Sequence, residues 1–290
     1  PKTTGTSPGL KLKDTKCVKW GAKFNGAKGK EVHAEIAATR IAWAVGFNVQ
    51  ESYLRTSGRV EFSTTAPKSG EVDLRYSALA PEVQAFIDSN GQYNSPMRLE
   101  RDEATDIEYA QTWFYNSNPI KDSPATAKYA SAQAIFNNLV ANWDLGKSVE
   151  KTNNQIVGVT NAQGQLEDWY IVSDYGATFG RMGKRSLLKR NHSKYELQDY
   201  ELRSKGGKNH PPVNYVEGNV VHMNTEGEII AGHIESLQQI PLEHAQWFAS
   251  VIAPLKESQI RDAFRAAGAS TEEMNGFSRI LKARIDQFVE

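Results

Sequence analysis

Apolar positions change their spacing along the chain, and the change separates a strand-rich first part from a helix-rich second part. In the first part, short apolar runs are bounded by glycine and polar residues, a pattern typical of strands. These runs predict strands over 16–20, 50–55, 60–63 and 97–101. Gly21 follows the first run directly and is expected to end that strand.

One helix is predicted among these strands, over about residues 31–45. A turn rich in glycine and lysine precedes it. Val32, Ile36 and Trp43 recur at helical spacing and form one apolar stripe. A run of alanines favours the helix, and Gly46 supplies its stop.

Helical spacing dominates the second part of the chain. A long helix is predicted over about 126–142, and two strands, 155–159 and 169–173, follow it around a turn at 161–165. Three further helices are expected at the end of the chain. Their apolar positions are Trp247, Phe248, Val251 and Ile252 after Pro241, then Ile260 and Phe264, then Phe277, Ile280, Leu281 and Phe288.

This order of elements predicts an α+β fold with segregated halves. The first half, 1–103, is expected to be a strand-rich lobe with one helix, and the second, 104–290, a helical lobe. The boundary is expected near 101–106. A cleft between two such halves is a natural ligand site.

Composition excludes several classes of protein. The 34 Lys and Arg residues balance 34 Asp and Glu residues, which argues against a dedicated nucleic-acid or membrane-surface protein. No apolar run approaches the roughly 20 residues of a membrane span. Cys17 is the only cysteine, so an internal disulfide and a cysteine-based zinc cluster are excluded. The chain begins with neither Met nor an apolar signal segment, as expected of a trimmed or processed chain. We expect it in the cytoplasm or the periplasm. We also expect a monomer.

The hairpin over 155–173 carries the clearest candidate for a metal site. Asn153 and Asn154 precede its first strand, and Asp174 follows its second. Asn154 and Asp174 each lie ten positions from Gly164, so an antiparallel pairing centred there places them side by side. Amide and carboxylate oxygens are hard ligands, as Mg²⁺ requires. The alternative is a pair of ordinary loop residues beside a plain turn.

Asp144 lies just after the predicted long helix. A carboxylate at this place can orient an attacking hydroxyl and accept its proton. The alternative is a residue that only caps the following turn.

Lys19 lies between Val18 and Trp20 in the first predicted strand, where a lysine is unusual unless its ammonium meets an anion. Glu31 and Glu35 lie one turn apart on the following helix and are its possible partners. A Lys–Glu pair would direct the ammonium toward nucleotide phosphates. The alternative is a solvated lysine on an edge strand, with surface glutamates.

These features follow one another in the order strand lysine, helix glutamate, post-helix aspartate with a downstream asparagine, and post-strand D-x-G. In this order the chain resembles the protein-kinase-like superfamily. It is most similar to a group of bacterial kinase-like proteins with V-K-F-G, E-V-H-A-E, N-W-D-L, N-N and S-D-Y-G-A-T-F-G motifs, and distantly to HipA-type and Golgi secretory kinases. The resemblance covers most of the chain.

The resemblance implies a two-lobed fold that holds ATP with Mg²⁺ or Mn²⁺. It implies that Lys19 contacts phosphate, that Glu35 holds Lys19, and that Asp144 is the catalytic acid or base. In the HipA-type pattern the paired glutamate lies eleven residues before the glycine that ends the helix, and this resemblance selects Glu35 over Glu31. Asn154 and Asp174 would bind the metal, with Asn153 as the rival asparagine.

The remaining residues expected to contact the nucleotide lie at the two ends of the first half: Thr4, Gly5, Thr6, Ser7 and Glu100. Three features depart from the usual kinase pattern. No G-x-G-x-x-G is present, Asn-Trp replaces His-Arg before Asp144, and the interval from Asp144 to the asparagines is nine or ten residues rather than five. A basic stretch over 181–194 is either a site for an anionic substrate or a solvated loop.

The sequence therefore predicts an ATP- and metal-dependent phosphotransferase that acts on a hydroxyl of a protein or small molecule. Two alternatives stay open: a pseudokinase that binds nucleotide without turnover, and an AMP transferase on the same scaffold. An enzyme is favoured over a binding module because a binding module need not keep all five of the candidate catalytic and metal-binding residues, which are Lys19, Glu35, Asp144, Asn154 and Asp174.

Overall fold

The computed structural model describes most of the chain. The described residues are 7–25, 30–66, 68–69, 74–101, 107–112, 124–142, 154–161, 163–172, 175–180, 193–202, 211–224 and 239–290. Within these ranges, the structure describes only the backbone of 107–112, 124–126, 154–157, 168–170, 172 and 202. Thr4, Gly5, Thr6, Asp144, Asn153 and Asp174 lie outside the described residues.

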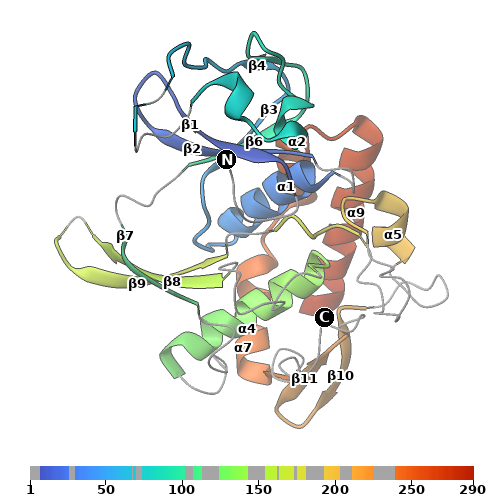
Figure 1. Cartoon of the computed structure of the whole chain (residues 1–290). Coiled ribbons are helices and arrows are strands. Elements are labelled where there is room, and N and C mark those ends of the chain that lie inside the picture. The colour runs from blue at the N-terminus through green and yellow to red at the C-terminus, as the bar shows by residue number, and fades with distance from the viewer. Residues whose placement is uncertain are drawn as a thin grey trace, which may run out of the picture.

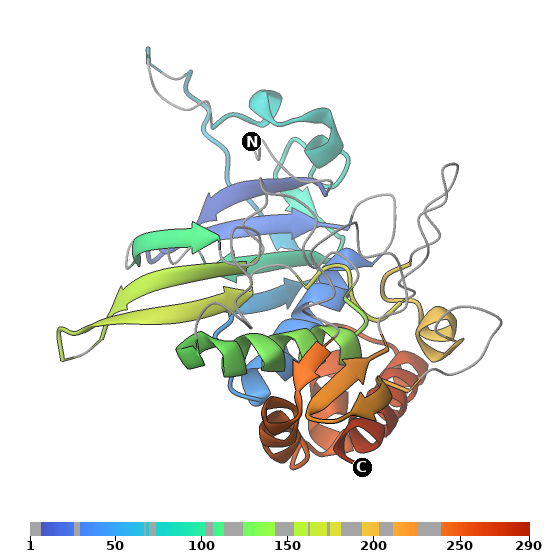
Figure 2. The same cartoon turned by 90° about the horizontal axis from the view of Figure 1, so that it is seen from below.

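The chain mixes helices with antiparallel sheets, as its sequence predicts. A four-stranded sheet lies at one end of the molecule, helix α1 lies between this sheet and helix α4, and α9 runs beside them from the level of the sheet (Figures 1 and 2). The sheet has the order β1-β2-β6-β3, and each neighbouring pair is antiparallel. Its elements are β1 (Gly9–Lys13), β2 (Lys19–Phe24), β3 (Ser52–Arg55) and β6 (Met97–Arg101), and the helix is α1 (Glu31–Ala44).

The remaining elements form smaller sheets and the helical part. Strands β4 (Gly58–Arg59) and β5 (Gln92–Tyr93) pair beside the short helices η1 (Tyr76–Ala78) and α2 (Pro81–Gln84). A second sheet has the order β7-β8-β9, with β7 (Ile107–Thr112), β8 (Asn154–Thr160) and β9 (Leu166–Val172). A third has the order β10-β11-β12, with β10 (Val213–Glu217), β11 (Val220–Met223) and β12 (Gln239–Pro241). The longer helices are α4 (Pro124–Leu139), α5 (Leu197–Leu202), α7 (Leu242–Ile252), α8 (Glu257–Ala266) and α9 (Thr271–Val289).

The two faces of the four-stranded sheet differ because successive strand residues point to opposite sides. On the outer face, Leu10, Phe24 and Met97 are buried in a cluster with residues from 60–93. The inner face carries Lys23 and Arg98 and faces helix α1. The sheet therefore presents one apolar face and one charged face.

The β1–β2 hairpin corrects the first predicted strand. Asp14 shapes the turn: its Oδ1 accepts hydrogen bonds from the backbone N–H groups of Lys16 (2.8 Å) and Val18 (2.9 Å). The strand begins after this turn and runs through Gly21 to Phe24. The prediction over 16–20 was wrong because a glycine inside a strand was taken as its end.

Helix α1 confirms the predicted helix and its stop. Gly46 has φ +90°, and the N–H groups of Gly46 and Phe47 bond back to the carbonyls of Trp43 and Ala42. This is the arrangement in which glycine ends a helix. Trp43 corrects the predicted stripe: its side chain is 73% exposed, because the core reaches the earlier turns of the helix and leaves this side of its last turn uncovered.

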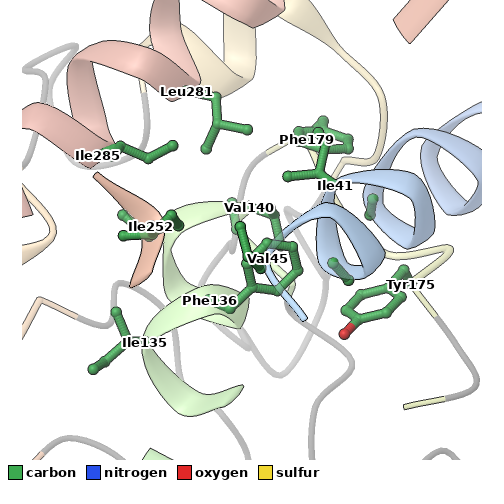
Figure 3. Packing of buried hydrophobic residues seen from close by; sticks show 14 of the residues in the cluster. Ile41, Val45, Ile135, Phe136, Val140, Tyr175, Phe179, Ile252, Leu281 and Ile285 are labelled. Carbon is green, nitrogen blue, oxygen red and sulfur yellow. The ribbon is translucent and has the colours of Figure 1, made fainter. Parts of the chain in front are cut away.

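The larger core joins α1 to the helical end of the chain. Figure 3 shows Ile41 of α1 and Val45, just after this helix, facing Phe136 of α4 and Val140, just after that one, with Phe179 beside Ile41. The apolar positions predicted for the last helix are buried, namely Phe277, Ile280, Leu281 and Phe288. Residues 60–63, predicted as a strand, form none; the nearby pairing is made by β4 instead. None of the helices in the described ranges combines the length and apolar character that a membrane span needs.

Candidate functional site

A chain of six alternating charges lies between the inner face of the sheet and helix α1. Its ion pairs run in the order Glu100, Arg98, Glu35, Lys23, Glu31, Lys194. We call these six residues the ion-pair chain. Strand β2 contributes Lys23, β6 contributes Arg98 and Glu100, α1 contributes both central glutamates, and the chain after 192 contributes Lys194.

Lys23 is the lysine at the centre of this arrangement. Its Nζ lies 2.7 Å from Oε1 of Glu31 and 3.2 Å from Oε2 of Glu35. The side chains of Lys23 and Glu35 are 7% and 1% exposed. Buried charges of this kind are tolerated only when they are paired. A buried strand lysine held by a helix glutamate is therefore present in this fold.

The predicted pair between Lys19 and Glu35 was wrong. Lys19, Gly21 and Lys23 point to the same face of the sheet, but Lys19 lies four residues earlier along strand β2. At about 3.3 Å per residue this separation is roughly 13 Å, which places Lys19 beyond the reach of Glu35. Lys19 is exposed and stands opposite Lys13 of β1. The lysine that Glu35 contacts is Lys23, and Glu31, the rival glutamate, contacts the same ammonium.

Arg98 and Glu100 extend the pairing across the sheet. Arg98 stands opposite Lys23, and Glu100 stands opposite Gly21. Arg98 donates to Glu35, and its two terminal nitrogens each lie 2.9 Å from one oxygen of Glu100. A Cβ placed on Gly21 would lie 3.7 Å from the Lys11 ammonium and 3.8 Å from Oε2 of Glu100. Glu100 thus lies on the same face as Lys23, where the sequence expected a nucleotide contact.

The chain before β1 runs beside the end of β2. Ser7 is buried, and the carbonyl of Pro8 accepts a 2.8 Å hydrogen bond from the N–H of Phe24. Ser7 therefore lies at the Lys23 end of strand β2. The neighbouring residues that were also expected to contact the nucleotide, Thr4, Gly5 and Thr6, lie outside the described residues.

Glu31 makes the stability of the fold depend on pH under acidic conditions. Burial acts to raise the pKa of its carboxyl group, but the ammonium groups of Lys23 and Lys194 outweigh burial and lower this pKa from 4.5 to about 2. A folded-state pKa below the unfolded value adds stability above the unfolded pKa. That stability is lost as the pH falls from about 4.5 toward 2.

We expect the stability advantage of the wild type over Glu31→Gln to shrink by about 3 kcal/mol as the pH falls through this window. Denaturant unfolding of both proteins at a series of pH values measures it. Parallel stability curves for the two proteins would show that Glu31 is not held ionised by its lysines.

Helix α4 ends at a fixed position shortly before Asp144, the predicted catalytic residue. Ala141 has φ +55°, and the N–H of Asn142 bonds to the carbonyl of Asn137 at 2.8 Å, the same closing pattern that ends α1. Arg284 of α9 is 2% exposed and donates to the carbonyls of Leu139 (2.9 Å) and Asn138 (3.1 Å). The chain therefore leaves α4 at Asn142 from a well-defined point. Asp144 lies two residues further on, outside the described residues.

Replacing Arg284 by methionine is expected to lower the free energy of unfolding by about 2–4 kcal/mol. The change leaves the buried carbonyls at the end of α4 without their charged donor, and each unsatisfied buried group costs about 1–3 kcal/mol. Chemical denaturation measures the loss. Lys282→Met is the matched control on the same helix, because Lys282 pairs with the exposed Asp286 of its own helix. Equal, small effects of the two changes would contradict a structural role for Arg284.

The hairpin is confirmed, with a corrected register. Its turn occupies 161–165, as predicted, and Asn161 and Gly164 close it. Asn154 pairs with Val172 rather than with Asp174, because Thr160 pairs with Leu166 and the pairing is centred on residue 163. The prediction that Asn154 faces Asp174 directly was wrong by two residues. Asp174 follows the end of β9 and lies outside the described residues.

The residues directly after Asp174 are fixed between α1 and α4. Tyr175 is buried, and its ring makes an edge contact with Phe136 at 5.8 Å (Figure 3). Burial raises the pKa of the Tyr175 phenol, and its hydroxyl has no hydrogen-bond partner among the described residues. The hydroxyl of Thr178 donates to the carbonyl of Tyr175 at 2.8 Å, and the N–H of Phe179 donates to that of Val140 at 2.8 Å. These contacts anchor the end of the predicted D-Y-G segment.

The described residues contain no group of three or more His, Cys, Asp or Glu side chains that could hold a metal ion. The predicted metal ligands are Asn153, Asn154 and Asp174. Only the backbone of Asn154, at the start of β8, is among the described atoms. The open end of the hairpin stays the predicted position for a metal, because the start of β8 and the end of β9 meet there. The residues with the predicted oxygen ligands lie at or next to these two strand ends.

A hollow of about 540 Å³ lies on the opposite side of the sheet from the ion-pair chain. Its lining includes Leu12, Trp20, Tyr53 and Leu99, all on the outer face, where residues 60–93 leave the sheet uncovered. Trp20 and Tyr53 meet edge to face at 5.9 Å. Because the sheet separates this hollow from Lys23, it is not the site in which Lys23 meets a ligand.

Comparison with known proteins shows no family for this chain. No family model matches the chain, and no curated protein sequence matches it. Among solved structures, the chain is similar to the crystal structure of a Helicobacter pylori proinflammatory kinase, CtkA. The TM-score is 0.47 at 11% identity, over 97% of this chain and 89% of that one.

Proposed function

We propose that this chain is an ATP- and divalent-metal-dependent phosphotransferase with a two-lobed, kinase-like arrangement. The observation that carries the proposal is the buried contact between Lys23 of the sheet and Glu35 of helix α1. In kinases, a strand lysine held by a helix glutamate binds nucleotide phosphates. Burying an ion pair costs desolvation free energy, and apolar residues of similar volume stabilise a core equally well. A buried ion pair is therefore better explained by a role in binding a ligand.

Other described features support the same function. Helix α4 delivers the chain to Asn142, two residues before Asp144, and strand β9 ends two residues before Asp174. In this proposal Asp144 accepts the proton of the acceptor hydroxyl, and Lys23 orients the phosphates. Asn154 or Asn153 holds the divalent metal together with Asp174. When bound, the metal neutralises charge on the transferred phosphoryl group.

Saturating Mg-ATP or Mn-ATP is expected to raise the melting temperature. A ligand at about 100 times its dissociation constant adds about 2.7 kcal/mol of stability. Asp174→Ala should remove this shift and leave the melt without nucleotide nearly unchanged. Asp262→Ala, which removes an exposed carboxylate paired with Arg265, is the control that should keep the shift. An identical wild-type melt with and without either metal nucleotide would count against an ATP site.

The reaction itself is tested with labelled ATP. Transfer or release of label from the γ position, but not from the α position, is expected of a phosphotransferase. Covalent label from the α position would identify an AMP transferase. Binding without either would identify a pseudokinase.

A further inference from the structure

The ion-pair chain ends on Lys194, which comes from the part of the sequence beyond Asp174. Glu31 uses one carboxylate oxygen for each of two lysines: Oε1 lies 2.7 Å from Nζ of Lys23, and Oε2 accepts from Nζ of Lys194. These lysines lie on opposite sides of Glu31 in the sequence, one on strand β2 and one near α5. A single buried carboxylate therefore connects the candidate phosphate-binding lysine to the segment after the D-Y-G motif.

The position of Lys194 is fixed by its neighbours. The N–H of Tyr195 donates to the carbonyl of Thr178 at 2.9 Å, and that of Glu196 donates to the carbonyl of Phe179 at 2.8 Å. The Tyr195 ring is buried against Phe277, with ring centroids 4.7 Å apart. The Lys194 side chain is only 15% exposed. Lys194 is thus a held part of the cluster rather than a solvated lysine that meets Glu31 by chance.

Charge counting shows what Lys194 does for the ion-pair chain. The six residues of the ion-pair chain are three cations and three carboxylates, so the formal charge of this group is zero. Without Lys194 its charge becomes −1, and Glu31 keeps Lys23 as its one ion-pair partner among the described residues. A negative cluster beneath the sheet opposes the binding of a polyanion such as ATP, and buried charges are poorly screened by salt.

We propose that Lys194 is a positioning residue of the nucleotide site and acts through its ion pair with Glu31. Lys194 neutralises Glu31, and Lys23 can therefore act on the nucleotide phosphates as a full positive charge. This inference rests on the proposed function, because it takes Lys23 as the phosphate-binding lysine. It assigns to the segment around residue 194 an electrostatic role in nucleotide affinity.

A double-mutant cycle that neutralises the two charges tests the inference, with the dissociation constant of Mg-ATP measured by titration calorimetry on the full chain. Lys194→Met should weaken binding by about five- to fiftyfold, as expected for one unit charge acting over several ångströms at an effective dielectric constant of about 20–40. Glu31→Gln should bind at least as tightly as the wild type. The double variant should return to within about threefold of the wild type, because its charge is again balanced. Lys194→Arg should bind like the wild type.

The control is Lys30→Met, which removes a lysine beside the start of the same helix that pairs with Glu273 instead. It should leave the dissociation constant nearly unchanged. Equal affinity of Lys194→Met and the wild type would overturn the inference, as would weaker binding by both single variants without recovery in the double variant. If Lys194→Met does not fold, weaker binding by Glu31→Gln alone is sufficient to overturn it. A wild type that binds no Mg-ATP would overturn the proposed function and this inference together, whereas the other outcomes leave the proposed function standing.

Discussion

Lys23→Met is expected to weaken Mg-ATP binding and to lower the free energy of unfolding by about 3 kcal/mol. Removing one partner of a buried ion pair leaves the other charge without compensation, which costs about 3–5 kcal/mol. The low end applies here because Glu31 keeps Lys194 and Glu35 keeps Arg98. A charge-assisted hydrogen bond to phosphate contributes about 1.5–3 kcal/mol, so affinity should fall by roughly one to two orders of magnitude. Denaturant unfolding and titration calorimetry measure the two effects.

The matched control is Lys19→Met on the same strand and the same face. Lys19 is exposed, so its replacement should change stability by less than about 0.5 kcal/mol and leave Mg-ATP affinity unchanged. The reverse result, with nucleotide binding lost in Lys19→Met and kept in Lys23→Met, would move the phosphate site away from helix α1.

Asp144→Asn is expected to keep Mg-ATP binding and to reduce turnover by roughly 10²–10⁴-fold. This is the usual contribution of a positioned acid or base. Affinity should be retained because Lys23, Glu35 and Asp174 are unchanged in this variant. Release of γ-labelled phosphate under single-turnover conditions measures the rate without a known acceptor, since water can take the place of the hydroxyl.

The contrast with Asp174→Asn separates two roles for a carboxylate in this region. Loss of turnover with retained binding is expected at position 144, whereas loss of binding is expected at position 174. If Asp144 only caps a turn, its replacement should lower stability and leave the rate unchanged. That result would favour a nucleotide-binding module without catalysis.

Local patterns predicted the regular elements well, because short-range chemistry fixes them. Helix α1, its stop at Gly46 and the turn at 161–165 all follow from residues close to one another in sequence. The buried positions of the last helix follow from its 3.6-residue period. Trp43 was misplaced because periodicity gives the face of a helix and does not tell how far along it the core extends.

The sequence predicted a strand lysine held by a glutamate of helix α1, but it selected the wrong lysine. Trp20, Ala22 and Phe24 alternate with Lys19, Gly21 and Lys23, and this alternation predicts a strand that passes through Gly21 and exposes Lys23 to the charged face. Treating the glycine as a stop selected Lys19 instead. The signal for the correct lysine was therefore present in the sequence.

Other features of the site depend on contacts that no local pattern contains. Arg98 reaches Glu35 across 63 residues of sequence, and Lys194 reaches Glu31 across 163. The hairpin register depends on which residues close the turn, and a shift of the pairing centre by one residue moved the partner of Asn154 from position 174 to 172. Such pairings follow from the assembled fold.

The most direct measurement of the central claim is affinity labelling with an acyl-phosphate derivative of ATP. The lysine amine that lies beside the bound phosphates attacks the acyl group, forms an amide and releases the nucleotide phosphate. Peptide mapping by mass spectrometry then identifies the labelled lysine. We predict labelling of Lys23 that an excess of Mg-ATP suppresses and that Asp174→Ala weakens. Mg-ATP-sensitive labelling of Lys19 in place of Lys23, or labelling that excess Mg-ATP does not reduce at any lysine, would contradict the proposal that Lys23 binds nucleotide phosphate.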